Sequence, residues 1–235
     1  MEDNAAQLVR DKTVLELGAG AGLPSLVCAI NGAKSVVVTD YPDADLIDNL
    51  QYNIDHCRVL PDQAAIYCEG YLWGADATKL TVHANQTGFD VVILADLLFN
   101  HSEHHKLLAT VQKTLKPTNE ARALVFFTPY RPWLLEKDLA FFTLAENGGF
   151  TVTKIFEKVM DKVMFENDPG VSRRRVQDSP CSNCADLQAT GRATAAYSLR
   201  LRIAPSSRFL KEFKLFKLSL YHHNGGSGGS DPILA

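Results

Sequence analysis

The sequence of 235 residues lacks the features that mark membrane and secreted proteins. No apolar run approaches the roughly 20 residues that a membrane-spanning helix needs. The acidic start, Met-Glu-Asp-Asn, has neither the basic nor the apolar region of a secretory signal peptide. Five cysteines, scattered and odd in number, argue against a disulfide framework. We therefore expect a cytoplasmic protein with no membrane partner.

Strong charge and metal-ligand spacing are missing as well. The formal net charge of −3 gives no basic footprint for direct nucleic-acid binding. The short run Arg173–Arg175 is more typical of a solvated surface. Cys181 and Cys184 form a lone C-x-x-C pair, whereas zinc needs four ligands. We therefore expect no metal site.

A glycine-rich turn follows the first predicted strand. Residues 14–17, Val-Leu-Glu-Leu, form a short apolar run that is typical of a buried parallel strand. Glycines at alternate positions let the chain turn sharply and leave no Cβ between the backbone and a ligand. They are Gly18, Gly20 and Gly22. A helix is predicted over residues 23–30.

An acidic residue ends the next predicted strand, residues 35–40. The carboxylate of Asp40 is placed there to accept hydrogen bonds from a ribose diol, so the pattern predicts a nucleoside-binding α/β site. The glycine spacing differs from the dinucleotide fingerprint. A carboxylate at Glu16 would repel a pyrophosphate but suits a cofactor with an ammonium and a sulfonium, which makes a dehydrogenase the least favoured alternative. The pattern resembles motif I of the S-adenosylmethionine methyltransferases.

Strands and helices alternate up to about residue 165, which predicts a doubly wound, mainly parallel α/β sheet. Further strands are predicted at residues 64–68, 89–96, 123–128, 150–157 and 197–203, and further helices at residues 43–56, 102–115 and 134–147. Ser102 is the candidate N-cap of its helix, and residues 79–88 are predicted to be a connection. We expect a core over residues 1–165, a loop or insertion at 166–192, a final strand and extension at 193–221, and a flexible tail at 222–235.

The loop after the strand at 89–96 carries groups that could hold an amine at the carboxyl edge of the sheet. Three of them are polar: Asp96, Asn100 and His101. Methyl transfer needs a neutral nucleophile held in line with the methyl group. His101 could accept a proton, and Phe99 could offer its ring face to a cation. The alternative is a solvated first helix turn, which we favour for His104 and His105.

Two further loops also follow predicted strands. Trp73 could stack on an adenine ring, or it could only cap the core, and the physical arguments are balanced. Tyr130 and Arg131 lie between two prolines that stiffen their loop. They could contact a substrate or only fix the loop.

Residues 14 to about 169 resemble the lysine-type protein methyltransferases of the seven-β-strand, Rossmann-like class. The resemblance rests on the segments VLELGAGAGLPSLVCAINGAKSVVVTDYPD, GYLWG, FDVVILADLLFNHSEHHKLL, LVFFTPYRPWLLEKDLAFF and MFENDPG. It implies a seven-stranded sheet and S-adenosyl-L-methionine as the cofactor. With Glu16 from the argument above, the expected cofactor contacts are Gly18, Ala19, Gly20, Asp40, Trp73 and Ala95. The implied substrate rim is Asp96, Asn100, Tyr130 and Arg131.

Within that class, the segment ADLLFNHSEHHKLL, residues 95–108, is similar to the enzymes that methylate translation elongation factor 1-alpha. The resemblance implies methylation of that protein's N-terminal glycine and a nearby lysine by a monomeric enzyme. Two alternatives stay open: an N-methyltransferase for a small amine such as nicotinamide, and a binding protein that keeps the fold without using the cofactor.

Overall fold

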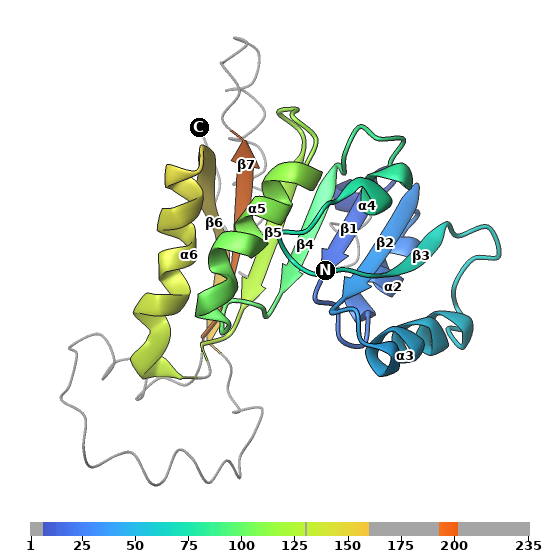
Figure 1. Ribbon diagram of the computed structural model, residues 1–235, viewed down its shortest axis with the longest axis horizontal. Coiled ribbons are helices and arrows are strands. Elements are labelled where there is room, and N and C mark those ends of the chain that lie inside the picture. Colours follow the sequence, from blue (N-terminus) through green and yellow to red (C-terminus); the bar gives the residue numbers. More distant parts are fainter. Residues whose placement is uncertain (1–6, 130, 160–192, 202–235) are drawn as a thin grey trace, which may run out of the picture. The chain divides into compact units, whose positions relative to one another are not determined.

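Seven strands form a single sheet (Figure 1). The computed structural model of the protein describes residues 7–129, 131–159 and 193–201. The strands are β1 (Thr13–Leu17), β2 (Ser35–Asp40), β3 (Ile66–Gly70), β4 (Val91–Ala95), β5 (Arg122–Phe127), β6 (Phe150–Val159) and β7 (Ala193–Leu201). The helices are α2 (Leu23–Ile30), α3 (Ala44–Asp55), α4 (Thr78–Val82), α5 (His104–Thr114) and α6 (Leu135–Asn147), with short 3-10 turns η1 (His101–Glu103) and η2 (Pro132–Leu134).

The strand order is β3-β2-β1-β4-β5-β7-β6. The pairs from β3 through β5 are all parallel, whereas β7 runs antiparallel to both β5 and β6. Among these seven strands, β7 is therefore the reversed one, and it lies between β5 and β6. This order confirms the prediction of a doubly wound, mainly parallel sheet of seven strands.

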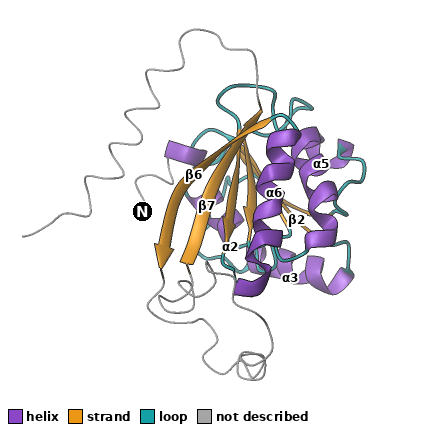
Figure 2. Cartoon of the chain, turned by 90° about the vertical axis from the view of Figure 1, so that its left-hand side faces the viewer, coloured by secondary structure: helices purple, strands orange, loops and turns teal. Residues whose placement is uncertain are grey.

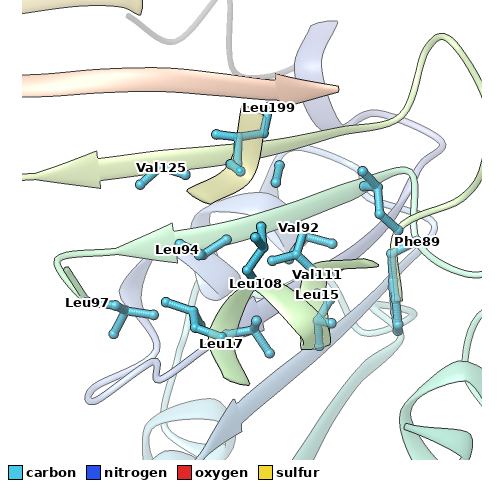
Figure 3. Packing of buried hydrophobic residues seen from close by; sticks show 14 of the residues in the cluster. Leu15, Leu17, Phe89, Val92, Leu94, Leu97, Leu108, Val111, Val125 and Leu199 are labelled. Atoms are coloured by element: carbon cyan, nitrogen blue, oxygen red, sulfur yellow. The ribbon is translucent and has the colours of Figure 1, made fainter. Parts of the chain in front are cut away.

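The central strands are buried on both faces, as their continuous apolar sequence predicts. Leu15 and Leu17 of β1 point to the face that α4, α5 and α6 cover, where Val92 of β4 meets Val111 of α5 (Figure 3). Val14 points to the opposite face and joins a second cluster with residues of α2. α5 and α6 lie side by side on the first face (Figure 2). The rigid sheet between these layers fixes the ends of its strands.

Several boundaries agree with the sequence patterns. α2 and β2 begin and end at the predicted residues, and β1 starts one residue earlier. The prediction that residues 79–88 are only a connection is wrong, because α4 covers the first part of them. Leu80, on that short helix, is 1% exposed and packs in the main core. Burial of this leucine therefore supports a helix that is too short to give a periodic pattern.

The predicted start of the helix at Ser102 is also wrong. Ser102 lies inside η1, and α5 begins at His104 with Glu103 at the N-cap and no side-chain capping bond. The hydroxyl of Ser102 instead donates to Asn100 Oδ1 at 3.1 Å. The serine thus stabilises the turn before the helix.

Some sequence predictions fall outside the described residues. These are the loop at 166–192 with its Arg173–Arg175 run and its Cys181 and Cys184 pair, the extension beyond residue 201, the tail at 222–235, and Tyr130. Within the described ranges, no helix has the length and apolar character to cross a membrane.

Candidate cofactor and substrate site

The predicted site residues gather at the carboxyl-terminal edge of the parallel strands (Figure 1). The glycine turn follows β1, Asp40 ends β2, Trp73 follows β3 and Asp96 follows β4. Because β1 pairs with both β2 and β4, these ends are neighbours in space. This edge of an open α/β sheet is where ligands usually bind.

The glycine turn needs glycine for two different reasons. Gly18, Gly20 and Gly22 all have positive φ angles, +59°, +57° and +75°, which side chains disfavour. A Cβ at Gly18 would also lie 2.7 Å from Leu97 and 3.0 Å from the indole of Trp73. At Gly20 a Cβ would meet nothing within 4 Å. The backbone at Gly20 is thus open to a ligand, whereas that at Gly18 is packed.

Asp40 holds the turn from the neighbouring strand. Its Oδ2 accepts a hydrogen bond from the Gly20 amide at 2.6 Å, and its Oδ1 accepts one from the Tyr41 amide at 2.6 Å. The Ala19 amide donates to the carbonyl of Thr39 at 2.9 Å. A carboxylate offers about four acceptor positions, so each oxygen of Asp40 keeps capacity for a hydroxyl donor.

Glu16 is a fully buried carboxyl group beside the turn, with 0% of its surface exposed. Its Oε2 accepts hydrogen bonds from the amide of Ser25, at 2.9 Å, and from the hydroxyl of the same residue. Its Oε1 has no partner among the residues that the structure describes. Burial, with a smaller contribution from the negative charge of Asp40, raises the pKa of Glu16 to about 7, although the two bonds from Ser25 lower it.

An unpaired buried carboxylate oxygen is costly unless a ligand completes its hydrogen bonds. A cationic donor, such as an ammonium group, matches this charge and this vacant acceptor position. The residues present therefore fit a cofactor that brings an ammonium to Glu16 and a ribose diol to Asp40, whose carboxylate is bonded to the open backbone of Gly20.

Asp96 has a strained backbone directly after β4. Its φ of +59° is in the left-handed region that non-glycine residues seldom adopt. The Asp96 amide donates to the carbonyl of Phe126 at 2.7 Å, and its Oδ1 accepts from the amide of Thr128 at 3.3 Å. These contacts with the β5 segment maintain the strained conformation, which is a feature of many functional sites.

The neighbouring candidates differ in exposure. Phe99 is 57% exposed, whereas Ala95 and Asn100 are half-buried. Asn100 Oδ1 accepts from Ser102, and its own carbonyl accepts from the Glu103 amide at 3.0 Å. The Phe99 ring is thus available to a partner, while Asn100 is part of the ordered turn.

Trp73 is half-buried and packs against the core as well as against Gly18. This packing agrees with a role in capping the core, and stacking of Trp73 on an adenine ring stays a prediction. Arg131 is exposed on the segment after β5. The cofactor and substrate roles of all these residues stay predictions.

His101 is bound by a residue that the sequence did not single out. Its Nε2 lies 2.6 Å from Oδ1 of Asp138, which is on α6 and 7% exposed. The expectation that His104 is solvated is wrong, because His104 is 5% exposed and its Nε2 lies 2.9 Å from the Leu98 carbonyl. Burial lowers its pKa. His105 is exposed, as expected.

Three supporting residues escaped sequence reasoning: Ser25, Asn53 and Asp138. Asn53 Nδ2 donates to the carbonyl of Ala21 at 3.0 Å and so ties α3 to the glycine turn. Nothing in their spacing signals these contacts, since each depends on how a helix packs. The part of the chain that the structure describes holds no group of three or more His, Cys, Asp or Glu side chains able to hold a metal ion.

The sequence is similar to those of known methyltransferases. Residues 1–147 match the lysine methyltransferase family. A protein N-terminal and lysine N-methyltransferase of Aspergillus fumigatus is 49% identical over 173 residues, which cover 72% of this chain and 67% of that protein. The protein of the same name from Gibberella zeae is 51% identical over 176 residues, covering 69% of this chain and 65% of that protein.

The fold also matches a solved structure. The YcgJ protein from Bacillus superposes with a TM-score of 0.59 at 12% identity, covering 86% of this chain and 100% of that chain. At this identity the likeness shows a shared fold and nothing about substrate.

Proposed function

The chain belongs to the lysine methyltransferase family, whose cofactor is S-adenosyl-L-methionine, and we propose that it methylates the N-terminal glycine and a nearby lysine of translation elongation factor 1-alpha. One observation carries the proposal: relatives that share about half of the aligned residues are named protein N-terminal and lysine N-methyltransferases. The similarity of residues 95–108 to the enzymes that methylate elongation factor 1-alpha supports the choice of substrate. That substrate would place the enzyme in the cytoplasm.

The glycine turn and its neighbours would hold the cofactor. Glu16 would accept hydrogen bonds from the cofactor ammonium, and Asp40 would accept them from the ribose hydroxyls. The open backbone around Ala19 and Gly20 would lie along the nucleoside, with Trp73 and Ala95 bordering the adenine. When bound, S-adenosyl-L-methionine supplies a methyl group on a positively charged sulfur, which a neutral amine attacks.

The second set of residues would bind the protein substrate. Asp96 and Asn100 would orient the amine by hydrogen bonds, and the exposed ring of Phe99 would face it when it is charged. Arg131 and its neighbour Tyr130 would contact the peptide beyond the amine. An α-amino group has a pKa of about 7.7–8.0, so an appreciable fraction is neutral near pH 7. Catalysis would then rest mainly on proximity and orientation.

A mass-spectrometric assay tests the proposal. The purified chain is incubated with S-adenosyl-L-methionine and a synthetic peptide of the elongation factor's N-terminus with a free glycine. We expect methyl groups on the glycine and on a nearby lysine. An N-acetylated peptide and a lysine-to-arginine peptide should each lose one of the two modifications.

Nicotinamide in place of the peptide is the matched control for a small-amine enzyme. Methylation of nicotinamide with an unmodified peptide would overturn the proposed substrate. Failure to bind S-adenosylhomocysteine in a calorimetric titration would overturn the proposed cofactor contacts.

A further inference from the structure

His101 and Asp138 form a histidine–carboxylate pair at the edge of the sheet where the candidate site lies. His101 belongs to η1, which follows β4, and Asp138 is in the first turn of α6, which follows β5. The Nε2–Oδ1 distance is 2.6 Å. The side chain of His101 is 25% exposed, and that of Asp138 is 9% exposed. A buried carboxylate thus holds an imidazole that still reaches the surface.

The pairing defines which ring nitrogen can accept a proton. A neutral imidazole has one N–H donor and one lone-pair acceptor. Because a carboxylate accepts the hydrogen bond at Nε2, it favours the tautomer with the proton on Nε2. Nδ1 is then the nitrogen that carries the lone pair. Histidine–carboxylate pairs orient general bases in unrelated enzymes by the same principle.

The surroundings of the pair support a role beyond anchoring the loop. From α5, the buried ring of His104 lies edge-on to His101 at 5.5 Å between centroids and is itself held by the Leu98 carbonyl. His104 already fastens the segment after β4, so the segment does not depend on His101 alone. Burial lowers the pKa of His104, which keeps a second positive charge away from the pair.

The neighbouring charged groups are paired or exposed, and Glu136 and Lys137 of α6 are exposed. Glu103 of η1 pairs with Lys106 at 2.9 Å, and His105 of α5 is exposed. Within the described residues, the ion-pair partner of His101 is therefore Asp138.

We propose that Asp138 is a positioning residue that holds His101 as the proton acceptor for the substrate amine. The inference rests on the proposed function. The charged amine R–NH3+ transfers a proton to Nδ1, and the resulting imidazolium is stabilised by the Asp138 carboxylate. The nitrogen lone pair of R–NH2 then forms the N–C bond to the methyl group. The C–S bond breaks with its electron pair on sulfur, which gives S-adenosylhomocysteine and R–NH2CH3+.

The tautomer of His101 can be measured without any substrate. Nitrogen-15 spectra of the full chain, with His101 assigned by its loss in the His101→Gln variant, report which nitrogen carries the proton in the neutral ring. We expect the proton on Nε2 in the wild type and a loss of this preference in Asp138→Asn. A proton on Nδ1 in the wild type would overturn the proposal.

Kinetics with the glycine peptide test the catalytic step. His101→Gln keeps a donor to Asp138 at the position of Nε2 but has no proton acceptor. We expect its kcat/KM to fall about 100-fold, as for loss of a general base. Asp138→Asn should fall about 10-fold, as for loss of an orienting partner. Both variants should bind S-adenosylhomocysteine like the wild type.

His105→Gln is the matched control, since it makes the same change on the exposed neighbour and should leave kcat/KM unchanged. Added imidazole should restore activity to His101→Ala. Full activity of His101→Gln, or no rescue of His101→Ala by imidazole, would mean that the pair only anchors the loop. If the wild type methylates no peptide, the proposed substrate fails, and the tautomer measurement still decides on the pair.

Discussion

Glu16 and Asp90 are acidic residues at opposite ends of two paired strands, β1 and β4, and they differ in how fully their carboxylates are hydrogen-bonded. Asp90, just before β4, accepts hydrogen bonds from the amide and hydroxyl of Thr13, both at 2.9 Å, and from Lys116 Nζ at 2.7 Å. Burial alone would raise the pKa of Asp90, but the bonds from Lys116 and Thr13 hold it below its usual value. Among the residues with a described structure, Glu16 has one oxygen without a partner, and its pKa is raised to about 7.

The difference separates a carboxylate that stabilises the fold from one that we propose binds a ligand. Both oxygens of Asp90 accept hydrogen bonds from groups of its own chain. Glu16 costs stability in the ionised form, and natural proteins accept such costs mainly at functional sites. The contributions of the two residues to stability should therefore change in opposite directions with pH. Substitution should raise stability at Glu16 and lower it at Asp90.

The largest effect is expected for Glu16→Gln. A folded-state pKa above the unfolded value means that the contribution of Glu16 to stability is complete below about pH 4.5 and is lost as the pH rises through about 7. The rise from 4.5 to about 7 corresponds to about 3 kcal/mol. The neutral glutamine should thus raise the free energy of unfolding at pH 8 by up to about 3 kcal/mol, as measured by urea denaturation.

The same variant should bind S-adenosylhomocysteine more weakly than the wild type, since a neutral amide no longer attracts the ammonium. For the wild type, affinity should fall as the pH drops below 7, because a proton then competes for Glu16. An unchanged affinity in Glu16→Gln would place the ammonium elsewhere.

Asp40→Ala should have the next largest effect, on cofactor binding. It removes the acceptor of the Gly20 amide and the acceptors that we propose for the ribose hydroxyls. Charged hydrogen bonds contribute about 1.5–3 kcal/mol each, so we expect affinity for S-adenosylhomocysteine to fall about 100-fold. A calorimetric titration at pH 8 measures this change, and Asp90→Ala serves as its control with unchanged affinity.

Asp90→Ala should in turn lower stability by about 2 kcal/mol, since it leaves Lys116 and the Thr13 amide without their acceptor. Its depressed pKa means that the contribution of Asp90 is present at neutral pH and is lost as the pH falls through the folded-state pKa. The variant and the wild type should therefore converge in thermal stability in strong acid. A constant difference down to the lowest pH would contradict the role of the ionised form.

The smallest effect is expected for alanine substitution at two comparable glycines. Gly20 and Gly149 have φ angles of +57° and +89°, and a Cβ at either would meet nothing within 4 Å. Alanine at either position should cost about 1–2 kcal/mol of stability from backbone strain alone. Only Gly20→Ala should also weaken S-adenosylhomocysteine binding. Equal affinities in the two variants would show that the ligand does not approach the turn.

The parts of the fold that depend on local sequence pattern could be predicted from the sequence. The apolar runs, the glycines and the acid at the end of β2 predict the sheet and the edge where the candidate site lies, and the structure confirms the fold. α4 was missed because five residues, with only Leu80 fully buried, give no periodicity. His104 was misjudged because its burial depends on Phe141 of α6, which packs against its ring.

The supporting contacts of the site could not be predicted from the sequence, for a related reason. Ser25 reaches Glu16 only because α2 folds back over β1, and Asp138 reaches His101 across 37 positions of the chain. Such pairs are set by how layers pack and carry no signature in spacing. Residue type predicts which groups can do chemistry, whereas tertiary structure decides which partners tune them.

The reversed direction of β7 has a consequence for how this scaffold tolerates change. β6 runs parallel to β5, so Val159 and Ala193 both lie at the carboxyl edge, and the segment between them is attached on the side of the candidate site. The entropy of closing a loop grows only with the logarithm of its length, about 0.6 kcal/mol for each doubling. Additions between β6 and β7 can therefore alter the surroundings of the site at little thermodynamic cost, while the register of every strand is preserved.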